Sequence, residues 1–268
     1  MAGSRNPNII VITCLLILCL FTSVQAGETH TGRTEVKVAI AHWPPWTIID
    51  NGISRGIDIE ILRRVETYVD VRFTFVECPW RRCLYLLKEG QVDMISSFAK
   101  RPERLSYAGY IGAAYVSDNI VFYSVKGKSH LIHQYEDLYN TTIGAVKGVA
   151  YFKRFDRDKS IVKTELTNEK PLLKMLLSGR LDVAIGYETT CDYLIAVYGY
   201  KDRFEKSPLK VAGQASYFAI SKKSKVRRLI PELVNVIERM SKSGETGHIV
   251  TTFLEKVKQS STTANTMK

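Results

Sequence analysis

The sequence contains few cysteines and, beyond its first 26 residues, no long apolar run. None of the later apolar stretches approaches the about 18 residues that a membrane-spanning helix needs, so we expect no transmembrane helix. The sequence also lacks a G-x-S-x-G nucleophile elbow, a glycine-rich phosphate loop and a His, Cys and Asp set with zinc spacing. His130 and His133 lie close together, but no third ligand is evident nearby. We therefore predict no metal site and no cofactor.

The first 26 residues have the pattern of a secretory signal peptide. Arg5 supplies the positive charge, residues 9–21 form an apolar run, and residues 24–26 (VQA) offer a cleavage site. A lipoprotein is the alternative because Cys19 follows an apolar stretch, but the small residues that lipidation needs before the cysteine are absent. We expect cleavage before Gly27 and export.

Removal of the signal leaves three cysteines in an oxidising compartment. The simplest pairing joins Cys78 to Cys83, within the segment CPWRRC, and leaves Cys191 as a small buried hydrophobe. Residues five apart in one helix point about 140° away from each other, so the bridge requires Cys78 to lie outside the helix. Pro79 suits this arrangement because it biases the residue before it toward an extended conformation. The segment therefore predicts a strand-to-helix elbow that is closed by a disulfide and fixes Trp80.

The chain is basic, with a formal net charge of +11. Such a charge favours anionic ligands or an anionic membrane surface. The excess is scattered over many segments, however, and an ordinary solvated surface explains it equally well. Export and the lack of a clustered basic and aromatic stripe argue against nucleic-acid binding. With 45% hydrophobic residues, the composition is that of a folded globular protein.

Short apolar strands alternate with amphipathic helices, and the alternation occurs twice. The first set comprises residues 36–41, 56–69, 72–77, 81–89 and 92–96, and the second comprises residues 141–146, 148–155, 161–166, 169–178 and 182–186. The phrase LLKEGQVDMI in the first set returns as LLSGRLDVAI in the second. Each phrase has a glycine that can end a helix in the left-handed conformation and an aspartate three residues later. The repetition predicts two similar α/β lobes with parallel strands.

Residues 120–125 lead out of the first set, and residues 210–220 follow the second. Two helical stretches come next, 225–243 and 245–257, separated by Gly244. If these helices pack back on the first lobe, the chain crosses between lobes twice, near residues 124–128 and 210–216. Two crossings would form a hinge.

Five segments, in this order, resemble the family 3 periplasmic solute-binding proteins, the bilobal amino-acid-binding components of ABC importers. They are GIDIEILRRV, FVECPWRRCLYLLKEGQVDMISSFAKRPERLSYAGY, IGAVKGVAY, LLSGRLDVAI and ERMSKSGETGHIVTTFLE. The opening HWPPWTI and the CPWRRC box look like a divergent branch. The resemblance spans about residues 36–257 and implies the type II periplasmic binding protein fold, two α/β lobes joined by a two-strand hinge. It divides the chain into lobe 1 (27–125), lobe 2 (126–212), a return to lobe 1 (213–258) and a disordered tail (259–268).

The resemblance also implies ligand contacts in the first lobe. Arg104 takes the place of the arginine that grips a carboxylate, which suits its planar, bidentate fork. Ser96 or Ser97 would donate beside it, and which serine faces the ligand stays open because the segment before Arg104 is one residue shorter than usual. Aromatic walls are implied at Trp46, Trp80 and Tyr115. Alternatives remain for these residues. Arg104 could be a surface arginine paired with Glu103 or Asp93. Trp46 and Trp80 could be core residues.

In the second lobe the resemblance implies contacts at Gly148, Tyr187 and Glu188. Gly148 is expected at a helix N-terminus, where free backbone N–H groups favour an anion. Tyr187 stands where the family has the aspartate that holds an α-amino group, with Glu188 next to it. Either Glu188 substitutes for that aspartate, or the ligand lacks an amino group there, or the ligand belongs to another class of small acid.

The implied protein is a periplasmic monomer that binds a small carboxylate, such as an amino acid, by hinge closure. It would deliver this ligand to an ABC permease in the inner membrane and would not be an enzyme. Two alternatives share the fold: a ligand-sensing module for a signalling partner, and an enzyme similar to the dehydratase that acts on cyclohexadienyl acids.

Overall fold

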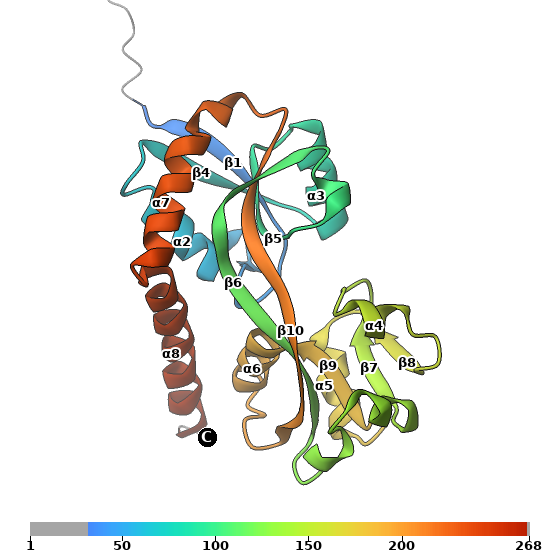
Figure 1. The fold of residues 1–268 in the computed structure, drawn as a ribbon. Helices are drawn as coiled ribbons and strands as arrows, with labels where there is room; N and C mark the ends of the chain where they lie inside the picture. The colour runs from blue at the N-terminus through green and yellow to red at the C-terminus, as the bar shows by residue number, and fades with distance from the viewer. Residues whose placement is uncertain (1–31, 267–268) are drawn as a thin grey trace, which may run out of the picture. The chain divides into compact units, whose positions relative to one another are not determined.

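One mixed sheet of eight strands runs through the chain, in the order β4-β1-β5-β10-β6-β9-β7-β8. The computed structural model describes residues 32–266, so the predicted signal peptide lies outside the described residues. The two longest strands, β6 (Ala108–Val125) and β10 (Phe204–Ser221), pair antiparallel in the middle of the sheet. Figure 1 shows them running side by side from β5 to β9. Within residues 32–266, every helix is too short or too polar to cross a membrane.

Three parallel strands and their helices stand on each side of this central pair. The first half contains β1 (Thr34–Ile40), β2 (Ile48–Asp50), β3 (Ile53–Arg55), α2 (Ile57–Val65), β4 (Val71–Glu77), α3 (Trp80–Glu89), β5 (Met94–Ala99) and the 3-10 turn η2 (Pro102–Arg104). The second half contains η3 (Ser129–Leu131), η4 (Tyr135–Asn140), β7 (Ile143–Val146), α4 (Lys153–Arg157), β8 (Lys163–Leu166), α5 (Glu169–Leu177), β9 (Val183–Tyr187) and α6 (Glu188–Val197). The predicted α/β alternation is confirmed, although α4 is shorter than the helix expected over 148–155.

The repeated sequence phrase folds the same way in both halves. Gly90 and Gly179 end α3 and α5 with φ of 71° and 70°, the left-handed conformation that glycine adopts without steric cost. Asp93 and Asp182 then each accept a hydrogen bond from a backbone N–H at or just before the neighbouring parallel strand, at 3.0 and 2.8 Å. The helix ending and the strand entry are therefore set by the same two residue types in each lobe.

The apolar side chains of the first half lie on both faces of its sheet. Val36, Val38 and Ile40 of β1 pack in a cluster with α2 and α7, whereas Ala39 faces the cluster under α3. This alternation follows from the two-residue period of a strand. Two further clusters lie in the second half, one with α5 and α6, to which Ile48 of β2 contributes, and one with α4 and η4.

The C-terminal helices return to the first half. Leu233, Val236, Ile237 and Met240 of α7 (Ile230–Lys242) lie in the cluster that also contains β1. The turn η5 (Lys225–Leu229) precedes α7, and α8 (Glu245–Thr266) follows it and contacts α2, α7 and α6. Residues 259–266, predicted as a disordered tail, continue α8, because each helical turn supplies its own backbone hydrogen bonds.

The two halves are joined where β6 and β10 have only each other as neighbours. β6 pairs with β9 from Ile120 to Tyr123, and β10 pairs with β5 from Ser216 onward. The crossing on β10 agrees with the predicted segment 210–216. The crossing on β6 lies before Ile120, upstream of the predicted crossing near residues 124–128. Residues 120–123 already belong to the second half because they pair with β9. At the crossing Gly213 touches the backbone: a Cβ there would lie 1.9 Å from the carbonyl oxygen of Asp118.

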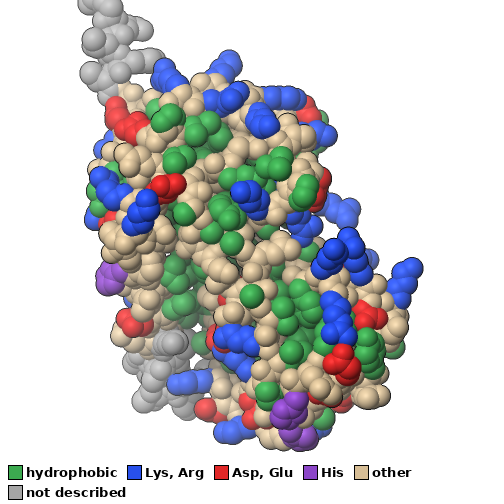
Figure 2. All heavy atoms as spheres, in the orientation of Figure 1, with side chains coloured by type: hydrophobic (Ala, Val, Ile, Leu, Met, Phe, Trp, Pro, Cys, Tyr) green, Lys and Arg blue, Asp and Glu red, His purple; other side chains and the backbone are tan. Residues whose placement is uncertain are grey.

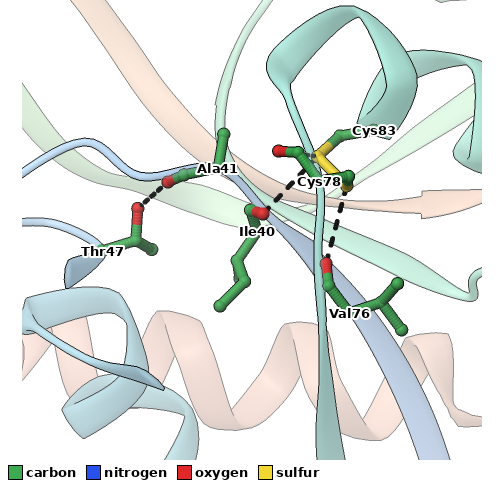
Figure 3. The surroundings of a disulfide bond; sticks show 6 residues. All are labelled: Ile40, Ala41, Thr47, Val76, Cys78 and Cys83. Carbon is green, nitrogen blue, oxygen red and sulfur yellow. Dashed lines mark hydrogen bonds between the residues drawn. A yellow bond between two sulfur atoms is a disulfide. The ribbon is translucent and has the colours of Figure 1, made fainter. Parts of the chain in front are cut away.

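The disulfide between Cys78 and Cys83 closes the turn from β4 to α3, as predicted (Figure 3). Cys78 lies just outside α3 and Cys83 inside it, with their Cα atoms 5.4 Å apart. The backbone N–H of Cys78 donates to the carbonyl of Ile40, 3.0 Å away, at the end of β1. The elbow is thus docked on the sheet and holds Trp80, the first residue of α3. Cys191 is free and buried, also as predicted.

Loss of this disulfide should lower stability without unfolding the chain. Closing so short a loop contributes about 2 kcal/mol in the chain-entropy account. We therefore expect Cys78→Ala with Cys83→Ala to lower the free energy of unfolding by about this amount, measured by urea denaturation. Reducing agent should destabilise the wild type and leave the double variant unchanged. Equal stabilities of the oxidised wild type and the variant would contradict the prediction.

Candidate functional site

A cavity of about 470 Å³ lies between the two halves, at the carboxyl ends of parallel strands from both. Its lining comes from the ends of β5, β7 and β9 and from the segments after β1, β4, β5, β7 and β8, with Gln214 from β10. Ligands of open α/β sheets bind outside the carboxyl ends of the strands, which makes this cavity the candidate site. A second cavity of about the same volume lies between the β3–α2 region and α8, away from those strand ends. Among residues 32–266, no three His, Cys, Asp or Glu side chains are grouped as a metal ion requires.

Arg104 lines the cavity from the turn after β5 and is 8% exposed. Its guanidinium lies over the rings of Phe98 and Trp80, 4.5 and 5.6 Å from their centroids. Its Nη1 donates to the carbonyl of Ala99 at 2.8 Å. In the described part of the chain Arg104 forms no ion pair, so the alternative of a surface pairing with Glu103 or Asp93 does not describe its surroundings. Burial lowers the pKa of Arg104, which is the direction expected of an uncompensated buried cation.

Ser96 and Ser97 both line the cavity, but the donors of Ser97 already have partners inside the protein. Ser97 has φ of 53°, an uncommon conformation for a residue with a side chain. Its hydroxyl donates to Asp58 at 2.6 Å and its backbone N–H to the Tyr115 hydroxyl at 2.9 Å. The Tyr115 hydroxyl in turn donates to Asp58 at 2.9 Å.

This network corrects the expectation for Tyr115. The ring is buried and stacks on Phe218 with centroids 4.2 Å apart, and Tyr115 does not belong to the described lining of the cavity. Its place is behind the wall, where it holds Ser97. No local pattern indicates this role, because Asp58, the third member of the network, lies 39 positions from Ser97.

The aromatic wall after β1 is formed by Trp43 rather than by the expected Trp46. Trp46 is 1% exposed, in the core against α2, while Trp43 lines the cavity. Trp43 meets Tyr187 of the second half edge-on, with ring centroids 5.7 Å apart. Trp80 lines the cavity as expected. The signal for Trp43 was its position close behind the strand, since parallel strands carry ligand contacts at that end.

Gly148 and Tyr187 line the cavity from the second half, as expected, but Gly148 does not begin a helix. It lies in a turn with φ of 79°, and α4 starts only at Lys153. The Tyr151 hydroxyl accepts from the backbone N–H of Val146 at 3.0 Å and keeps the segment in this turn. The helix-terminus argument for an anion at Gly148 therefore does not apply. The Tyr187 hydroxyl donates to a backbone carbonyl at 2.7 Å, and burial raises its pKa to about 12.

Glu188 is engaged elsewhere and does not contribute to the described cavity lining. Its carboxylate pairs with Lys206 and Lys210 of β10, at 2.8 and 2.7 Å, and accepts from Asn119 at 3.0 Å. Burial alone would raise the pKa of Glu188, but these three hydrogen bonds lower it to about 2. The acidic side chain that does line the cavity is Glu169, at the start of α5, which the sequence interpretation missed.

Comparison with solved structures identifies the class of fold. An ancestral arginine-binding protein bound to arginine superposes with a TM-score of 0.67 at 19% identity, covering 82% of this chain and 98% of that one. The second substrate-binding domain of GlnP from Lactococcus lactis, in the open conformation, gives 0.63 at 21% identity, covering 82% and 95%. These likenesses concern the fold alone, which is the type II periplasmic binding protein fold with two lobes.

The family follows from the sequence. Residues 36–256 match the bacterial extracellular solute-binding proteins, family 3. A probable amino-acid-binding protein, YxeM, of Bacillus subtilis (strain 168) is 29% identical over 175 residues, which cover 63% of this chain and 62% of that protein. The match thus spans less than two thirds of that relative's length. The chain belongs to family 3 of the bacterial extracellular solute-binding proteins, as its motifs indicated.

The Asp58 network should make stability depend on pH. Burial raises the pKa of Asp58 from 3.8 to about 6, against the opposing hydrogen bonds from Ser97, Ser96 and Tyr115. The folded state therefore binds this proton more tightly than the unfolded state, and the stability gained from it is lost as pH rises from about 4 to about 6. We expect a loss of about 3 kcal/mol over this range.

Asp58→Asn removes this titration. The stability of the variant relative to the wild type, from thermal unfolding without ligand, should therefore rise between pH 4 and pH 7. Asp50→Asn, at an exposed aspartate, is the control and should show no such trend. Parallel pH profiles for Asp58→Asn and the wild type would contradict the prediction.

Proposed function

We propose that the protein is an exported solute-binding protein that captures a small carboxylate, an amino acid or a related acid, in the cavity between its lobes. The observation that carries the proposal is Arg104, a buried guanidinium at the cavity that has one carbonyl partner and no carboxylate among residues 32–266. A buried charge is costly unless it is paired. A ligand carboxylate supplies that pair and fits the bidentate fork.

Hinge closure is the proposed mechanism. Trp43 of the first lobe and Tyr187 of the second both line the cavity, so a bound ligand would touch both lobes. A ligand that makes contacts in both lobes stabilises the closed arrangement over the open one. The bending would take place at the β6–β10 crossing, where these strands pair only with each other.

The remaining assignments rest on the family. Residues 1–26 would direct the chain to the periplasm and be removed, and the closed form would deliver its ligand as a monomer to an ABC permease in the inner membrane. The protein would return its ligand chemically unchanged. The names of the relatives, an amino-acid-binding protein and the arginine-binding and GlnP domains, support binding rather than catalysis.

The test is a thermal-shift screen of amino acids, keto acids, small peptides and aromatic acids. A ligand at one hundred times its Kd stabilises the folded state by about 2.7 kcal/mol. Arg104→Ala should abolish the shift because it removes the carboxylate fork, while Arg81→Ala, at an exposed arginine outside the cavity, should preserve it. A folded Arg104→Ala protein with an unchanged shift would refute this role of Arg104.

A further inference from the structure

A second arginine, Arg101, lies beside Arg104 in the wall of the cavity. The two residues bound one 3-10 turn, in which the N–H of Arg104 donates to the carbonyl of Arg101 at 3.1 Å. Both side chains line the cavity, and the repulsion between their charges contributes, after burial, to the lowered pKa of Arg104.

Among residues 32–266, Arg104 has no ion pair and Arg101 has only a weak one. The Nε of Arg101 is buried and has no hydrogen-bond partner in the described structure. Its nearest acid, Glu103, is 4.0 Å from Nη1, and that side chain is 66% exposed, so the pair is weak. Each guanidinium has five donors. In the proposed function one ligand carboxylate is held by Arg104. That carboxylate cannot accept hydrogen bonds from all the unpaired donors of Arg101 and Arg104 together.

The rest of the described lining adds to the positive charge. Among the described lining residues, Lys147 contributes a further cation from the second lobe, and Glu169 is the only acid. Burial raises the pKa of Glu169, which favours its neutral form. The Nδ1 of His42 accepts a hydrogen bond from the N–H of Ile49 at 3.0 Å. Three cations thus face at most one negative charge.

The basic character of the whole chain does not account for this cluster. Figure 2 shows Lys and Arg side chains spread over the visible face of the molecule, where water solvates them at little cost. Arg104 is buried, and Arg101 has a buried Nε. Arg101 also lies close enough to Tyr187 of the opposite lobe for its charge to lower the pKa of that phenol, against the larger effect of burial. Its position therefore suits a group that both lobes enclose.

We infer that the ligand carries a second acidic group, and that Arg101 is the residue that selects it. The inference rests on the proposed function, in which Arg104 holds the first carboxylate. The ligand class is a small organic acid with at least two anionic groups. The second group is a carboxylate or a phosphate monoester, because both present anionic oxygens that a guanidinium binds through two parallel hydrogen bonds.

Calorimetry with matched ligand pairs tests the inference. Two pairs differ by one carboxylate charge: glutamate and glutamine, and succinate and succinamate. The third pair, phosphoserine and serine, tests the phosphate. The wild type should bind the more acidic member of at least one pair tenfold or more tightly, because a charge-assisted pair is worth at least one factor of ten. The pair that shows the preference identifies the second group.

Arg101→Gln should abolish this preference and leave the affinity for the less acidic member within twofold. Arg82→Gln, at an exposed arginine of α3 outside the cavity, should change neither affinity. Arg101→Lys retains a charge but not the fork and should keep part of the preference. Thermal unfolding verifies that each variant is folded.

Equal or tighter binding of the less acidic members by the wild type would overturn the inference and leave the proposed function intact. So would a preference that survives in Arg101→Gln. Absence of binding to every acid tested would instead refute the proposed function, and the inference with it.

Discussion

The antiparallel pairing of β6 with β10 is the constraint on which the rest of the structure depends. These two strands are the link in the sheet between the parallel sets of the two halves. Because both sets end at the same cavity, residues from strands and loops of both halves meet there. Gly213 permits the close approach to the backbone of Asp118 at the crossing, where a side chain would collide. This connection leaves the cavity between two halves that the sheet joins through a single pair of strands.

The electrostatic character of the cavity depends on where the arginines are held. Arg104 is stacked on Phe98 and Trp80, and aromatic faces attract a cation by about 1 kcal/mol or more when it is desolvated. Trp80 is positioned by the elbow that the Cys78–Cys83 disulfide closes. The covalent link therefore supports the binding wall from behind. It explains why an unusual cysteine spacing stands beside a tryptophan at the cavity.

The site could be predicted in part, and the misses have physical reasons. Arg104, Trp80 and Tyr187 were named from the resemblance to the family, and all three line the cavity. Tyr115 and Glu188 were named in the same way, but partners distant in the chain remove them from the cavity: Asp58 holds Tyr115, and two lysines of β10 neutralise Glu188. Long-range pairings of this kind leave no local pattern.

The sequence by itself determined the α/β alternation, the two similar lobes, the family and the disulfide. The alternation and the disulfide depend on spacing within short segments, where the periods of helices and strands and the reach of a disulfide act locally. The lobes and the family follow from the order and repetition of such segments along the chain. Only the tertiary structure decided that Trp43 rather than Trp46 faces the cavity and that Arg101, paired only weakly with the exposed Glu103, lies beside Arg104. The direction of a side chain and the pairing of a charge depend on which distant residues pack against it.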